Sequence, residues 1–335
     1  MVQSRAIRTT SGDARVTEQP TARAVDGYPH DALFYDSADQ LVEVAVPFLT
    51  RGLEIGDAAV IAAGAAATRV LCDALDGDPR VQVMGRGDVY NARTATAITT
   101  YRRLAQRDDR TPGSRVRVVG EIDYGRSDRD RLEWQRYEAV INEALVGWPL
   151  SGMCLFDTAR LPDTVLESAA STHQHLATPR GRQRNDDFVD PAEYLRSLPV
   201  PPDPLLDTAP RLWAKDVADF IGLRHAVAAE LATVAAPREL IEDFLLSVDE
   251  MTSNAVRHGR SPVSLRLWLG GDRIVCVIGD SGLGWDDPFA GYGPAHGEDL
   301  SRGGMGLWLA RQLCDHVDIE HGDDGVRVRL TTRLT

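Results

Sequence analysis

The chain has 335 residues, 43% of them hydrophobic and 26% charged, which is enough for two globular domains of ordinary composition. Its 50 acidic and 37 basic side chains give a net charge of −13, which argues against direct binding of nucleic acid over a broad surface. No apolar run approaches the ~18 residues of a membrane span, and the N-terminus lacks the apolar core of a signal peptide. We therefore predict a cytoplasmic protein that binds neither nucleic acid nor membrane.

Residues 1–28 are polar and carry no periodic apolar pattern, which predicts a disordered tail. From there to about residue 175, short apolar runs alternate with stretches of helical periodicity. Strands are predicted at 32–36, 57–63, 81–84, 115–122 and 153–157, and helices at 38–52, 68–75, 92–106, 131–145 and 162–175. This alternation is typical of a parallel α/β sheet with helices on both faces. We assign it to a first domain over residues 29–196.

A proline-rich segment follows the first domain. Residues 197–210 hold five prolines among fourteen residues, a density that favours extended chain and predicts a linker. Beyond it, residues 211–335 predict a second domain that begins with two helices and continues with antiparallel hairpins. Its helices are expected at 214–234, 238–257 and 304–315, and its strands at 263–269, 273–280, 317–322 and 325–334. This order indicates an α+β two-layer sandwich.

The four cysteines show no regular spacing and no CxxC pair. Three of them lie in apolar runs, namely Cys154, Cys276 and Cys314, and the fourth is Cys72. Such cysteines are typical of small core side chains in a reducing compartment. We interpret them as core residues and predict neither a disulfide frame nor a zinc site.

The second domain carries a carboxylate and an amide on one face of its second helix. Glu250 and Asn254 are four residues apart in SVDEMTSNAVRHG, so they lie one helical turn apart. In a pocket, an asparagine can coordinate a Mg²⁺ ion that bridges phosphates, and a glutamate can take a proton from an attacking hydroxyl. Two solvent-exposed polar side chains would show the same spacing, so this segment alone leaves both interpretations open.

Two glycine-rich segments follow it. Asp280-Ser-Gly-Leu-Gly284 ends an apolar strand, where the acid can accept a hydrogen bond from an adenine amino group and the glycines admit a flat base. Gly303-Gly-Met-Gly306 opens a helix, whose exposed N–H groups suit phosphate oxygens. Each string alone also fits an ordinary turn or loop.

In this order the three segments resemble the N, G1 and G2 boxes of the GHKL (Bergerat-type) ATPase superfamily. No phosphate loop of the type GxxxxGK[ST] occurs in the chain. The resemblance implies that ATP and Mg²⁺ bind here, with Glu250 as general base, Asn254 as the Mg²⁺ ligand and residues 285–302 as a lid. The nucleotide-binding residues predicted in this way are Asn254, His258, Asp280, Gly282, Gly284, Gly304, Met305 and Gly306.

The compact layout, with a helix directly before the N box and the ending NAVRHG, resembles the anti-sigma-factor serine kinases. This resemblance implies phosphorylation of a serine or threonine on a STAS-type anti-sigma antagonist, a sequestered sigma factor as the alternative partner, and a homodimer. Two alternatives stay open. One is a catalytically quiet, nucleotide-gated binding protein that sequesters a sigma factor. The other is an atypical sensor histidine kinase, although His225 lacks the acidic residue that follows the phosphoacceptor histidine.

The first domain resembles the MEDS sensory domain, a RecA-like module. The resemblance rests on HDALFY (30–35), PFLTRGLEIGD (47–57), VVGEIDYG (118–125) and LFDT (155–158). AAGAAATR (62–69) stands where a RecA-like fold carries its phosphate loop and lacks Lys-Ser/Thr, which argues against nucleotide hydrolysis in this domain. Several acids and histidines could meet at the carboxyl ends of the strands and bind a metal or a small ligand. They are His30, Glu121, Asp123, Asp157, His173 and His175; the ligand stays open.

Overall fold

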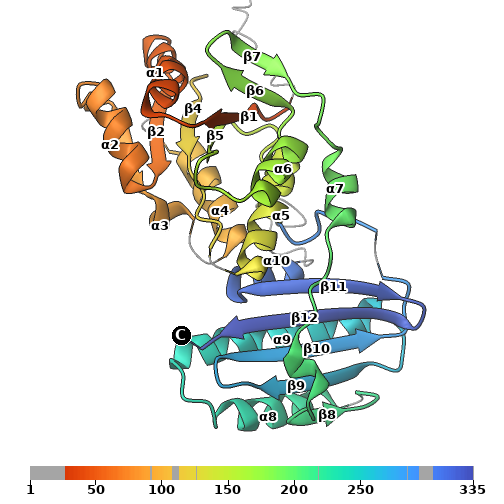
Figure 1. Cartoon of the computed structure of the whole chain (residues 1–335). Coiled ribbons are helices and arrows are strands. Elements are labelled where there is room, and N and C mark those ends of the chain that lie inside the picture. Colours follow the sequence, from red (N-terminus) through yellow and green to blue (C-terminus); the bar gives the residue numbers. More distant parts are fainter. Residues whose placement is uncertain are drawn as a thin grey trace, which may run out of the picture.

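The computed structural model describes residues 27–90, 93–107, 113–125, 127–217, 219–284, 286–293 and 305–334. The predicted disordered tail lies almost wholly outside these ranges. Within them the chain forms two sheets, each with its own helices, which lie next to each other (Figure 1). A search of the described helices finds none that is both long and apolar enough to cross a membrane.

The first sheet is mainly parallel and has the strand order β3-β2-β4-β5-β1-β6-β7. β7 alone runs antiparallel to its neighbour, β6. The predicted parallel α/β fold is thereby confirmed. Its strands are β1 (His30–Tyr35), β2 (Ala58–Ala63), β3 (Val81–Gly85), β4 (Val116–Gly120), β5 (Leu150–Asp157), β6 (His175–Thr178) and β7 (Gly181–Arg184).

Helices cover both faces of this sheet, as the alternating pattern predicts. The apolar sides of α1 and α2 pack on one face and those of α4, α5 and α6 on the other, which gives the domain two buried cores. Serine side chains cap α1 and α5, since Ser37 and Ser127 accept hydrogen bonds from backbone N–H groups of the first turn. The helices are α1 (Ala38–Glu54), α2 (Ala65–Ala74), α3 (Arg86–Val89), α4 (Thr94–Ala105), α5 (Asp128–Ala144), α6 (Asp163–Thr172) and α7 (Pro191–Ser197).

The prediction of a helix over 162–175 is wrong at its C-terminal end. α6 stops at Thr172, His173 has an extended backbone, and His175 begins the hairpin of β6 and β7, which the sequence did not predict. Both histidines therefore lie beyond the end of α6. The side chain of His173 is buried in the core, whereas that of His175 is partly exposed.

The second sheet is antiparallel, with the order β11-β12-β10-β9-β8. Three helices pack their apolar sides on one of its faces, which confirms the predicted two-layer sandwich (Figure 1). The helix expected over 214–234 starts only at Phe220, because 212–214 pairs with β9 as an edge strand. The elements are β8 (Leu212–Ala214), α8 (Phe220–Leu231), α9 (Arg238–His258), β9 (Ser264–Leu269), β10 (Arg273–Asp280), α10 (Gly306–Leu313), β11 (His316–Gly322) and β12 (Gly325–Arg333).

The proline-rich segment packs on the opposite face of the second sheet. A short 3-10 helix, η1 (Pro204–Asp207), brings Leu205 and Leu206 against Trp268 and the valines of β10. The indole Nε1 of Trp268 donates to the backbone oxygen of Thr208 at 3.0 Å. The segment is therefore attached to the sheet along its length. The limits 29–196, 197–210 and 211–335 stay predictions for the domain boundaries.

Candidate functional site

The first candidate feature lies where α9 meets the start of α10. The apolar side of α9 is buried in the core, while Glu250 and Asn254 lie half-buried at its edge. A Cβ atom built on Gly306 would lie 2.8 Å from Oε2 of Glu250 and 2.9 Å from Nδ2 of Asn254. A side chain at this position would have to displace the ends of Glu250 and Asn254. The structure therefore brings together the predicted base, the predicted Mg²⁺ ligand and the glycine that opens α10.

The free backbone N–H groups in the first turn of α10 lie next to Glu250 and Asn254. Met305 precedes the helix, and the N–H groups of the first helical turn have no partners within the helix, which leaves them to bind anions. Gly304, which the sequence also assigns to phosphate contacts, lies outside the described residues. Most of the predicted lid does too, apart from residues 286–293.

The second candidate feature is Asp280, at the end of β10. Its Oδ1 accepts hydrogen bonds from the backbone N–H groups of Gly282 at 2.7 Å and Arg260 at 3.1 Å. Oδ2 makes no hydrogen bond to the described residues, so it is available to a ligand. Gly284 has φ +70° and lies against β12, where a side chain would collide with Val326. The acid and its glycines thus form one rigid turn.

The two features lie along one helix. Glu250 and Asn254 contact the start of α10, and Gly259, directly after α9, lies against the Asp280 carboxylate. From Glu250 to Gly259 the chain rises roughly 14 Å, which separates the end predicted to bind phosphates from the end predicted to bind the base. His258 is the last residue of α9, is exposed, and lies at the second of these ends.

A groove that the sequence did not predict adjoins Glu250. It has a volume of about 440 Å³, lies between α8 and α9, and is lined by the apolar side chains of Phe220, Ile221 and Val256. Arg224 and Asp249 form an ion pair of 3.0 Å across it, and burial raises the pKa of Asp249. A cavity of about 540 Å³ lies elsewhere, between the two domains, and does not include the residues predicted to bind nucleotide.

Residues 286–293, the described part of the predicted lid, contact the first domain. Tyr292 is only 4% exposed and belongs to the core that lies under α4 and α5. The guanidinium of Arg311, on α10, stacks 4.1 Å from the Tyr292 ring and donates to its hydroxyl at 3.1 Å. Tyr292 thus connects the core of the first domain, residues 286–293 and α10.

A buried ion-pair cluster also crosses between the domains. Asp318 of β11 contacts Arg129 and Arg136 of α5, at 2.8 and 3.1 Å, and Arg329 of β12 at 2.8 Å. Burial alone would raise the pKa of Asp318, but the three guanidinium groups outweigh it and hold this pKa well below its usual range. This contact could not be predicted from the sequence, because its members lie on elements that are far apart in the chain.

The fold and the converging segments define a histidine-kinase-like ATPase domain joined to a sensory α/β domain. Residues 214–332 match the family described as "Histidine kinase-like ATPase domain", and residues 29–174 match "MEDS: MEthanogen/methylotroph, DcmR Sensory domain". A curated relative, the serine-protein kinase RsbW of Bacillus subtilis, is 34% identical over 128 residues, which are 35% of this chain and 79% of the relative. The chain belongs to the family of these anti-sigma-factor serine kinases.

Other comparisons agree over shorter stretches. RsbW of Bacillus velezensis is 34% identical over 105 residues, 28% of this chain, and the chain spans 65% of that relative's length. A crystal structure of the RsbU and RsbW domains of Rv1364c from Mycobacterium tuberculosis shares 23% identity, covers 38% of this chain and 33% of that one, and has a TM-score of 0.25. A TM-score this low adds nothing to the assignment. Membership of the family implies that the second domain binds ATP.

Proposed function

We propose that this chain is a protein kinase that transfers the γ-phosphoryl group of ATP to a serine or threonine of a STAS-type anti-sigma antagonist. The observation that carries the proposal is the close approach of Gly306 to Glu250 and Asn254. It puts a carboxylate that can take a proton, an amide that can bind a cation, and a helix end that can bind phosphates within a few ångströms of each other.

Each residue then has a distinct role. The amide oxygen of Asn254 would hold a Mg²⁺ ion, which keeps several waters and takes few protein ligands. A bound ion would supply positive charge that offsets the charge on the phosphates. Backbone donors of Gly304, Met305 and Gly306 bind the phosphate oxygens. Asp280 accepts from the adenine amino group, the backbone of Gly282 and Gly284 lies along the base, and His258 borders the pocket.

The transfer itself needs little covalent chemistry from the protein. The acceptor hydroxyl oxygen attacks the γ-phosphorus, the bond from this phosphorus to the bridging oxygen of ADP breaks, and the hydroxyl proton passes to Glu250 and then to solvent. Glu250 borders the groove between α8 and α9, which gives a folded protein substrate a surface to bind while its hydroxyl reaches the carboxylate. A sigma factor is the alternative partner, and a homodimer remains a prediction.

Control by the sensory domain forms part of the proposal. The lid is anchored by Tyr292 in the core of the sensory domain, and Asp318 joins the second sheet to α5. A rearrangement of the sensory core would therefore change the position of the lid and of Arg311, which stacks on Tyr292 from α10. This route would couple the bound state of the sensory domain to nucleotide turnover and to the choice of partner.

The test is phosphoryl transfer by the full chain. The chain is incubated with Mg²⁺, γ-labelled ATP and purified STAS-type proteins of the same organism. Glu250→Gln should lower transfer by at least about 100-fold, because general base catalysis contributes this much, while ATP binding stays unchanged. Glu242→Gln, on the exposed side of the same helix, is the matched control and should transfer normally.

Unchanged transfer by Glu250→Gln would remove the proposed base. Stable ATP-dependent binding of a sigma factor with no transfer to any STAS-type protein would favour the quiet sequestering protein. Acid-labile phosphate on the chain itself would indicate a histidine kinase.

A further inference from the structure

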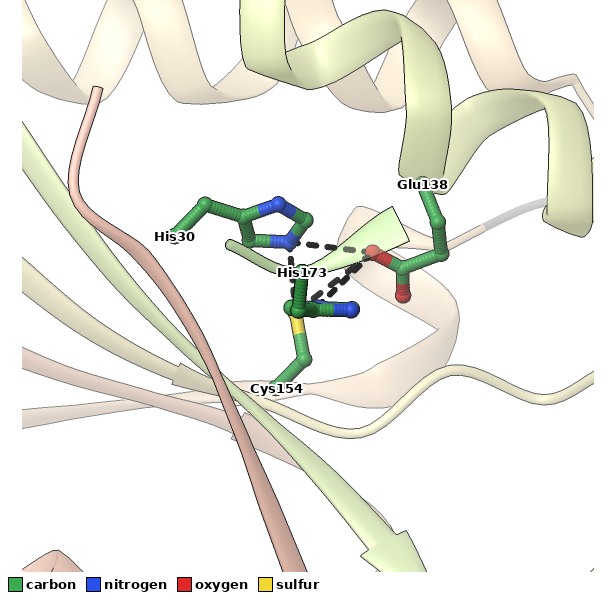
Figure 2. A group of neighbouring side chains, drawn as sticks. All are labelled: His30, Glu138, Cys154 and His173. Carbon is green, nitrogen blue, oxygen red and sulfur yellow. Dashed lines mark hydrogen bonds and ion pairs between the residues drawn. The ribbon is translucent and has the colours of Figure 1, made fainter. Parts of the chain in front are cut away.

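A cluster of four potential metal ligands lies in the core of the sensory domain. His30 at the start of β1, Glu138 of α5, Cys154 of β5 and His173 after α6 point toward one another (Figure 2). Their ligating atoms all lie within 4.8 Å of one another, and the residues are only 2, 1, 7 and 0% exposed, respectively. Four separate elements of the fold thus supply one side chain each to a common point.

The distances within the cluster fit a tetrahedral ion. Nε2 of His30 lies 3.0 Å from Oε2 of Glu138 and 3.3 Å from Sγ of Cys154. Oε2 of Glu138 lies 3.5 Å from Nε2 of His173 and 3.7 Å from Sγ of Cys154. Zinc bonds of roughly 2.0 Å to nitrogen or oxygen and 2.3 Å to sulfur place the ligands of a set with one sulfur about 3.3 to 3.6 Å apart. These four distances are therefore close to the spacing of a metal-bound set.

The hydrogen bonds around the cluster leave both imidazoles with a lone pair directed inward. Nδ1 of His173 donates to the backbone oxygen of Ala169 at 2.8 Å. Nδ1 of His30 lies 3.2 Å from Oδ1 of Asn142, whose amide nitrogen is committed to the backbone oxygens of Glu138 and Thr172 at 2.9 Å each. The proton of each neutral ring is therefore on Nδ1, and Nε2 is an acceptor, as in metal-bound histidines.

Without a cation the cluster is under-satisfied. Nε2 of His173 is buried and has no hydrogen-bond partner among the described residues, which is unfavourable for a buried polar atom. A protonated Glu138 can donate to only one of the two Nε2 atoms. A metal ion would satisfy both.

We propose that His30, Glu138, Cys154 and His173 form a closed, four-coordinate site for a divalent transition metal of the Zn²⁺ class. Imidazole and thiolate ligands favour such an ion over Mg²⁺ or Ca²⁺, which take oxygen ligands. Tyr124 donates to Oε1 of Glu138 at 3.3 Å, which leaves Oε2 for the ion. Cys154 is buried in the core as expected, and its sulfur in addition lies next to His30 and Glu138.

The site has a direct connection to the second domain. Glu138 lies on the core side of α5, while Arg129 and Arg136 on another side of the same helix contact Asp318 of β11. Binding of the ion would fix α5 against β1 and β5, and the ion-pair cluster would carry this constraint to the ATPase sheet. The site therefore has the position of either a structural or a signal-receiving centre.

The test measures metal on the full chain. Protein produced in zinc-supplemented medium and purified without chelator should contain close to one equivalent of zinc. After exchange with Co²⁺ it should show the intense d–d bands of a tetrahedral ion and a near-ultraviolet thiolate charge-transfer band. Cys154→Ser should lose the thiolate band, and Asn142→Ala, which no longer orients His30, should bind Co²⁺ about 10 to 100-fold more weakly.

Two matched controls keep the assignment specific. Cys72→Ser changes a half-buried cysteine of α2, and His175→Asn changes the histidine that begins β6; both should retain the metal and both Co²⁺ bands. Circular dichroism of each variant identifies a failure to fold. A folded wild type that takes up neither zinc nor Co²⁺ would overturn the site and leave a hydrogen-bonded core cluster. A thiolate band that persists in Cys154→Ser would overturn the ligand assignment.

Discussion

The two halves of this molecule build their candidate sites in opposite ways. In the sensory domain, four side chains from four elements converge in a closed core, and none is more than 7% exposed. In the ATPase domain, the candidate site is half-exposed and extends along α9 between the start of α10 and the end of β10, and glycines bring its backbone groups close together. A closed site suits a tightly held ion, whereas an open one suits a nucleotide that must enter and leave.

The largest effect should come from Gly325, at the start of β12. It has φ +131°, and a Cβ there would overlap the backbone oxygen of Asp280. We expect Gly325→Ala to destabilise the ATPase domain by about 4 kcal/mol or more, since strain and overlap act together, while the metal content of the sensory domain is retained. Chemical denaturation measures the first effect and metal analysis the second.

Gly271→Ala is the control for this substitution, because open space surrounds Gly271 in the turn between β9 and β10. Equal denaturation midpoints for the two variants would contradict the tight turn at Asp280. Loss of the metal from Gly325→Ala would contradict an effect confined to the ATPase domain.

The glycines and the metal cluster also show what a sequence can reveal. Glu250 and Asn254 are four residues apart and the glycine-rich segments follow in a fixed order, so the order of local segments was enough to indicate the ATPase family, while the roles of the single residues stay predictions. His30 and Cys154 are 124 positions apart, and Glu138 is one charged residue among many on α5. Only the parallel pairing of β1 with β5 brings them together. The interdomain contacts of Tyr292 and Asp318 were inaccessible for the same reason.

The next largest effect concerns Tyr292, which connects the halves. Tyr292→Ala should remove about 3 kcal/mol of packing from the domain contact, as for other buried aromatic truncations. Residues 286–293 and the start of α10 should then exchange amide hydrogens faster, which mass spectrometry measures. Tyr292→Phe keeps the ring, loses only the hydrogen bond from Arg311, and should behave almost as the wild type. Unchanged exchange in the alanine variant would contradict the anchoring of the lid.

A smaller effect is expected at the junction of α9 and α10. A methyl group at Gly306 would displace the ends of Glu250 and Asn254, and Gly306→Ala should weaken ATP binding about tenfold, which corresponds to about 1.4 kcal/mol. Isothermal titration of the full chain measures this. Gly87→Ala, in open space in the sensory domain, is the control. Wild-type affinity in Gly306→Ala would mean that the phosphates bind elsewhere.

The smallest effect is a pH dependence from His316, which is packed against α5. Burial, with the charge of Arg129, lowers the pKa of His316 to about 3, although Asp318 and Asp315 oppose the shift and Arg333 adds to it; Glu133 lies 3.8 Å from its Nδ1. The unfolded chain takes up this proton below about pH 6.5. The stabilisation is therefore complete above pH 6.5 and declines as the pH falls, by about 1.4 kcal/mol at pH 5.5.

His316→Phe removes this titration, so its free energy of unfolding should fall less between pH 7.5 and pH 5.5 than that of the wild type. Denaturant titrations at the two pH values measure the difference. An equal loss of unfolding free energy in the two proteins would show that His316 takes up its proton at the same pH in the folded and the unfolded chain.

The proposed function depends most on the nucleotide site of the second domain. The most direct measurement is a titration of the full chain with ATP in the presence of Mg²⁺, for the wild type, Asn254→Ala and Asp280→Asn. We predict saturable binding by the wild type and at least a tenfold loss in each variant, because one removes the cation ligand and the other the adenine acceptor. Absence of binding by the wild type, or equal binding by all three proteins, would contradict the site.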